Sequence, residues 1–154
     1  MESGLYSYKY LKGQLCVALG GRVAEELVFG GEEVTTGASN DLQQVRNIAR
    51  RMVAQWGFSK DALAPTAWES ASQSQGMTQT ASEQTESTID TEVSKLVNDA
   101  YAVCKEAMGK NRPLLDAIVE ELLEKETLDG QDLDKLVMKF TGSILNERPE
   151  IVTA

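Results

Sequence analysis

The chain contains no histidine, only two cysteines and three prolines, and no long apolar run. A membrane-spanning helix needs about 20 consecutive apolar residues. The longest apolar stretches, around residues 15–19 and 27–29, are far shorter, and the N-terminus lacks a basic-then-apolar signal pattern. We therefore expect this chain by itself to be soluble, with any membrane anchor of a parent protein outside the 154 residues.

Basic residues are also scarce. The chain has 15 Lys and Arg residues and 24 Asp and Glu residues, which gives a formal net charge of -9. No window concentrates enough positive charge to neutralise a phosphate backbone. The composition therefore argues against a nucleic-acid partner.

The two cysteines, Cys16 and Cys104, lie far apart, each within an apolar helical pattern. They belong to separate helix stripes and have no paired spacing, so a cysteine-based metal site is not expected. Two isolated cysteines in apolar surroundings usually behave as small buried hydrophobes. We expect structural thiols in a reducing compartment.

The remaining pattern predicts an all-α fold. With 154 residues, 42% of them hydrophobic, the chain can form one compact core. Apolar residues recur every three to four positions in several segments, as they do on one face of an amphipathic helix. The prediction is a bundle of about five helices, with a long polar loop near 70–88, a single domain over 1–140 and an irregular tail over 141–154. The expected helices lie at about 7–30, 40–57, 89–111, 113–123 and 130–140.

Several helix boundaries can be predicted from local chemistry. Asn40 suits an N-cap, with Gln43 at the N3 position of a capping box, and Gly57 suits a C-cap. Asp129 begins a turn and N-cap for the last helix. Gly20 and Gly21 lie in the middle of the first helix, where each costs about 1 kcal/mol relative to alanine. We expect another backbone to pack closely against them.

One acidic side chain, Asp41, follows a glycine-containing turn at the entry to the second predicted helix. Gly37 allows the chain to turn through conformations that other residues avoid. By itself, Asp41 has a simple structural explanation, because an acid in the first helical turn is favoured by the helix dipole. A phosphate-binding loop is excluded, since the segment lacks the Lys-Ser/Thr ending and a preceding apolar strand. No nucleotide site is expected in this chain.

Two neighbouring motifs carry a resemblance to a known family. Residues 20–26 read Gly-Gly-Arg-Val-Ala-Glu-Glu, and residues 36–41 read Thr-Gly-Ala-Ser-Asn-Asp. Together they closely resemble the peptidase domain of the FtsH family, the membrane-anchored ATP-dependent zinc metalloproteases. The resemblance covers about residues 2–140. Residues 2–7 and 56–59 match as well, and the opening segment looks most like the plastid and algal branch.

The resemblance implies a role for each of several residues. Asp41 matches the family's third zinc ligand, and the two histidine ligands belong to a His-Glu-x-x-His helix that precedes this segment in the family. Glu25 and Glu26 could orient a ligand or be structural, and Arg22 is expected to pair with Glu26 four residues on. With no histidine, this chain alone is predicted to be catalytically inactive and to bind no zinc. The family's ATP site lies in an upstream domain.

Two functions fit these observations. The first is the C-terminal part of the peptidase domain of an FtsH-like protease that degrades membrane or unfolded proteins. Its parent would be a hexameric ring with an N-terminal membrane anchor, in the plastid thylakoid or in a mitochondrial or bacterial inner membrane. The second is a non-catalytic helical module for assembly or scaffolding, derived from such a protease.

Overall fold

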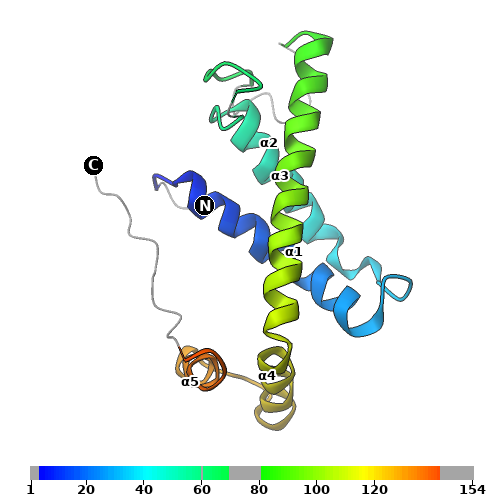
Figure 1. Ribbon diagram of the computed structural model, residues 1–154, viewed down its shortest axis with the longest axis vertical. Helices are drawn as coiled ribbons and strands as arrows, with labels where there is room; N and C mark the ends of the chain where they lie inside the picture. Colours follow the sequence, from blue (N-terminus) through cyan, green and yellow to red (C-terminus); the bar gives the residue numbers. More distant parts are fainter. Residues whose placement is uncertain (1–3, 60, 70–80, 143–154) are drawn as a thin grey trace. The chain divides into compact units, whose positions relative to one another are not determined.

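The computed structural model describes residues 4–59, 61–69 and 81–142. Over these residues the chain forms five α-helices and one short 3-10 helix, without a strand (Figure 1). The all-α prediction is thereby confirmed. The chain divides into two compact units, one over Leu5–Cys104 and one that groups the described residues from Lys105 onward with Gly4. In the described part of the chain, no helix has both the length and the hydropathy to cross a bilayer.

The first helix, α1, spans Tyr8–Phe29, close to its predicted bounds. Ser7 caps its N-terminus, where the Ser7 hydroxyl accepts a hydrogen bond from the Tyr10 amide at 3.1 Å. Gly30 ends it in a backbone conformation with φ of 84°, which favours glycine. The buried side chains recur every four residues and form a single stripe: Leu11, Leu15, Leu19 and Val23.

The second helix, α2, spans Ser39–Ala54 and packs against α1. Its buried residues follow the expected periodicity: Val45, Ile48, Ala49, Met52, Val53 and Ala54. Leu42 and Trp56, at the two ends of this periodicity, are each 40% exposed. The predicted C-cap, Gly57, is wrong: Gln55 is the C-cap, and Gly57 follows two residues later with φ of 68°.

The third helix, α3, spans Glu83–Lys110, so the predicted polar loop near 70–88 is wrong for residues 83–88. Residues 70–80 of that prediction lie outside the described residues. The helix begins without an apolar period because its start is stabilised by polar groups. The Ser82 hydroxyl accepts from the Thr85 amide at 3.2 Å, and Glu83 and Glu86 place negative charge in the first turn.

Arg50 of α2 connects three segments of this first unit. The Arg50 Nε atom donates to the Glu69 carboxylate at 2.9 Å. The Nη2 atom donates to the Glu86 carboxylate of α3, also at 2.9 Å. Asp90 lies 3.6 Å away in the next turn of α3. The hydrogen bond to Glu69 is the largest cause that raises the pKa of Arg50, which therefore stays charged.

The second unit contains the end of α3, α4 over Arg112–Lys125 and α5 over Gly130–Thr141. Pro113 lies in the first turn of α4, as predicted. Asp129 caps α5 as predicted, and Asp132 completes a reciprocal capping box. Residues 143–154 of the predicted tail lie outside the described residues, and the assignment of 1–140 to one peptidase domain stays a prediction.

The α1 stripe yields a stability prediction. Leu15 is fully buried, so Leu15→Ala should lower the free energy of unfolding of the first unit by about 2–5 kcal/mol, through lost burial and the cavity left behind. Leu5 is 75% exposed and serves as a matched control, for which Leu5→Ala should change stability by less than about 0.5 kcal/mol. Urea denaturation followed by circular dichroism measures both. Equal effects of the two substitutions would contradict the assigned core.

Candidate functional site

Asp41 lies in the first turn of α2, directly after a 3-10 helix, η1, that spans Thr36–Ala38. The Thr35 hydroxyl accepts a hydrogen bond from the Gly37 amide at 3.2 Å and so caps this turn. Asn40 was predicted as the N-cap of α2 and instead lies inside the helix, because Ser39 and the 3-10 turn already continue into it. The N-cap is Ala38, which makes no side-chain capping bond.

The Asp41 carboxylate faces Gly21 of α1. Its Oδ2 atom lies 3.7 Å from the position that a Cβ on Gly21 would occupy. The predicted close approach of a backbone to Gly20 and Gly21 is therefore wrong: a side chain approaches Gly21, and nothing among the described residues lies within 4 Å of the same position at Gly20. Asp41 makes no hydrogen bond or ion pair with any described residue.

Glu25 of α1 holds the turn that precedes Asp41. One oxygen of its carboxylate accepts from the Thr35 amide at 2.9 Å, and the other accepts from the Thr35 hydroxyl at 3.0 Å. Hydrogen bonds to a charged acceptor are stronger than neutral ones. This Glu25–Thr35 clamp fixes the start of η1 on α1 and, through η1, the start of α2.

Gly37 is required for space, not for an unusual backbone. The prediction of a conformation barred to other residues is wrong, because the described glycines with positive φ are Gly30, Gly57 and Gly142. A Cβ at Gly37 would lie 3.2 Å from the Thr35 hydroxyl and 3.6 Å from the Glu25 carboxylate. Any side chain at this position would therefore press on the Glu25–Thr35 clamp.

Glu26, next to Glu25, contacts different residues. Arg22 donates to Glu26 at 3.0 Å, so the predicted pair four residues apart is present. The Tyr101 hydroxyl of α3 also donates a short hydrogen bond to the Glu26 carboxylate. The tyrosine was not predicted, since nothing in the sequence connects residues 75 positions apart. The hydrogen bond to Glu26 is the main cause that raises the pKa of Tyr101.

The two cysteines lie close together where α1 meets α3, although their sequence positions indicated no pairing. The Cys16 thiol contacts the Ala100 carbonyl at 3.5 Å, and the Cys104 thiol contacts the Cys16 carbonyl at 3.5 Å. Both are free, and burial raises the pKa of each thiol. Cys104 is buried and Cys16 partly so, in agreement with structural thiols.

The described residues do not form a metal site by themselves. A zinc enzyme holds its ion with three protein ligands and keeps one position open for water. In the part of the chain that the structure describes, no group of three or more Cys, Asp or Glu side chains is arranged to hold a metal ion. Asp41 can therefore contribute one ligand at most.

The Tyr101–Glu26 hydrogen bond predicts an alkaline pH dependence. Because the folded pKa of Tyr101 lies above the ordinary value near 10, its contribution to stability is present below about pH 10 and is lost as pH rises through the folded pKa. Tyr101→Phe should cost about 0.5–1 kcal/mol at pH 8, and this difference should vanish at higher pH.

Urea denaturation at a series of pH values measures this difference. Tyr10→Phe is the control, because the Tyr10 hydroxyl makes no hydrogen bond to the described residues. A Tyr101→Phe deficit that stays constant through the tyrosine titration would contradict the assignment.

Comparison with known proteins connects this geometry to a family. The model of peptidase family M41 matches residues 1–136. An ATP-dependent zinc metalloprotease, FtsH 3 of Synechocystis, is 50% identical over 145 residues, which are 89% of this chain and 23% of that protein. Chloroplastic FTSH 5 of Arabidopsis thaliana is 45% identical over 88% of this chain and 20% of its own length. The chain thus spans about a fifth to a quarter of the relatives it matches, and it belongs to peptidase family M41.

Proposed function

We propose that this chain is the C-terminal part of the peptidase domain of an ATP-dependent zinc metalloendopeptidase, and that by itself it is catalytically incomplete. The relatives at 45–50% identity carry that activity in their names. The described residues lack the ligands for a complete zinc site. The remaining ligands and the ATP-hydrolysing machinery would then come from the rest of a longer protein.

We propose further that Asp41 supplies one of three zinc ligands in that longer protein. The observation that carries this assignment is a carboxylate at a helix start that is held in place, with no polar partner among the described residues. The 3-10 turn and the Glu25–Thr35 clamp hold the helix start, while Asp41 itself forms no hydrogen bond or ion pair with the described residues. Such a carboxylate is available to coordinate a metal ion whose other ligands come from outside this chain.

The neighbouring residues would act by position and not by contact with the metal. Glu25 fixes the turn before Asp41 through Thr35, and Gly37 leaves room for that clamp. Glu26, with Arg22 and Tyr101, connects α1 to α3. We therefore assign Glu25 and Gly37 to the placement of Asp41, and Arg22 and Glu26 to the support of α1.

For the longer protein, we propose the arrangement that the family resemblance implies. It would form a hexameric ring that degrades membrane or unfolded proteins and is anchored in a membrane by a segment outside this chain. The relatives include cyanobacterial and chloroplastic proteins, which supports a plastid location, with the thylakoid membrane as the specific proposal.

The role of Glu25 predicts a local effect on hydrogen exchange. Glu25→Ala removes both acceptors of Thr35, so the Thr35 and Gly37 amides should exchange about tenfold faster, which corresponds to about 1.5 kcal/mol for hydrogen bonds to a charged group. Amide exchange measured by NMR tests this. Glu33→Ala, an exposed acid in the same connection, should leave both rates within twofold. Unchanged rates in Glu25→Ala would show that Glu25 does not hold the turn before Asp41.

A chimera tests the proposed function directly. This chain would replace the matched 145 residues of Synechocystis FtsH 3, so that the other parts come from a named zinc protease. We expect the chimera to bind about one zinc per chain and to hydrolyse casein in the presence of ATP. In the chimera, Asp41→Ala should lower zinc content at least tenfold and abolish casein hydrolysis, while ATP hydrolysis persists.

Matched measurements complete this test. Glu33→Ala in the chimera should keep zinc and activity, and the isolated chain should bind zinc no more tightly than an ordinary acidic surface. Submicromolar, stoichiometric zinc binding by the isolated chain, lost in Asp41→Ala, would contradict the proposed incompleteness. A folded, ATP-hydrolysing chimera without zinc would favour the non-catalytic scaffold instead.

A further inference from the structure

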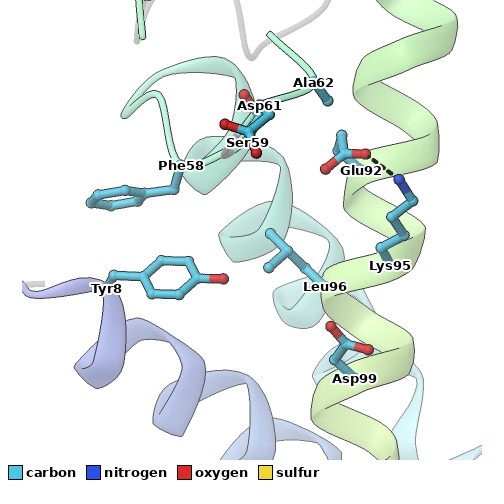
Figure 2. A pocket seen from close by; sticks show the side chains of 9 residues that line it. All are labelled: Tyr8, Phe58, Ser59, Asp61, Ala62, Glu92, Lys95, Leu96 and Asp99. Atoms are coloured by element: carbon cyan, nitrogen blue, oxygen red, sulfur yellow. Dashed lines mark hydrogen bonds and ion pairs between the residues drawn. The ribbon is translucent and has the colours of Figure 1, made fainter. Parts of the chain in front are cut away.

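A cavity of about 260 Å³ lies in the first unit, away from Asp41. It is lined by the first turn of α1, the segment that follows α2 and the middle of α3, and is open to solvent on one side (Figure 2). Pockets for drug-sized ligands range from about 300 to 1,000 Å³. The cavity is therefore suited to one side chain or a ligand of similar size.

Two aromatic rings form one wall of the cavity. Tyr8 and Phe58 pack at 5.4 Å between ring centroids with a tilt of 57° (Figure 2). The face of an aromatic ring attracts cations. The Tyr8 ring already interacts with one cation of this chain, because the Lys12 ammonium lies 5.6 Å from its centroid.

Charged side chains also line the cavity, together with Ser59, Ala62 and Leu96. Asp61, Glu92 and Asp99 contribute three negative charges against one positive charge from Lys95. Lys95 is engaged with Glu92 at 2.6 Å. Asp61 and Asp99 form no hydrogen bond or ion pair with the described residues and lie at opposite ends of the opening in Figure 2. Two carboxylates thus remain available beside an aromatic wall.

These features exclude several ligand classes. The net negative lining disfavours phosphates and nucleic acids, and the carboxylates disfavour a purely apolar ligand. A metal ion is also disfavoured, since the described residues contain no group of three or more side chains arranged to hold one. A cation with a flat or apolar portion satisfies both the rings and the carboxylates.

We propose that this cavity binds an arginine side chain of another polypeptide. A guanidinium can stack on an aromatic ring and donate through several N–H groups, whereas a lysine ammonium is a more strongly hydrated point charge. A carboxylate at one end of the cavity, Asp61 or Asp99, would accept from the guanidinium while its plane packs on Tyr8 or Phe58, and the other carboxylate would add to the attraction of the positive charge. Arginine should therefore bind more tightly than lysine. This inference does not depend on the proposed protease function.

The test is an NMR titration of the full 154-residue chain with a blocked glycine-serine peptide that carries a single arginine. Matched peptides carry citrulline, which is the uncharged isostere, or lysine. We expect Kd for the citrulline peptide to be at least fivefold higher than for the arginine peptide, with lysine in between. Shifts of amide signals should map to residues around Tyr8, Phe58 and Asp99.

Variants distinguish binding in this cavity from nonspecific attraction of a cationic peptide to an acidic chain. The Asp61→Asn, Asp99→Asn double variant should raise Kd for the arginine peptide at least fivefold, and Tyr8→Leu should also raise it. The charge-matched control pair, Glu120→Gln and Asp134→Asn, alters exposed acids in the second unit and should change Kd less than twofold. Circular dichroism verifies that each variant is folded.

Equal binding of arginine and citrulline peptides, or an equal loss of affinity in the control pair, would overturn the proposal. So would peptide-induced shifts confined to α4 and α5. Because none of these measurements involves zinc or proteolysis, their failure would leave the proposed function unaffected.

Discussion

The packing of the apolar stripe of α1 against α2 is the constraint on which the candidate site depends. Leu15 and Val23 of α1, and Met52 and Val53 of α2, are fully buried. Complete burial of such a side chain is worth about 1.5–3 kcal/mol. This contact fixes how α1 is rotated relative to α2. It thereby places Gly21 opposite Asp41.

The same rotation explains why two adjacent glutamates have unrelated partners. Successive residues of an α-helix point about 100° apart, since 3.6 residues complete one turn. Glu25 consequently contacts Thr35, before α2, while Glu26 contacts Tyr101 on α3. Removal of either carboxylate would loosen a different neighbour of α1. The pair acts as two anchors on one helix and not as a single acidic patch.

The elements that were predictable are those whose signals are local. Ser7 and Gly30 bound α1 and Asp129 caps α5, because each satisfies backbone groups within a few residues. The predicted start of α2 and the predicted loop over residues 83–88 were wrong, since a 3-10 turn and a polar helix start have no apolar period. The partners of Glu25 and Glu26 depend on tertiary packing. Thr35 had a weak local signal, a threonine two residues before a glycine, whereas Tyr101 had none.

The contacts of Arg50 have a consequence for how the first unit would respond to the loss of one side chain. Arg50 of α2 binds Glu69, in the segment that follows α2, and Glu86 of α3, so one guanidinium holds two carboxylates from different parts of the sequence. A charged group that loses its hydrogen-bond partner in a partly buried place costs about 1–3 kcal/mol. Loss of Arg50 would leave both carboxylates without this partner, whereas loss of Glu69 or Glu86 would leave the other pair in place.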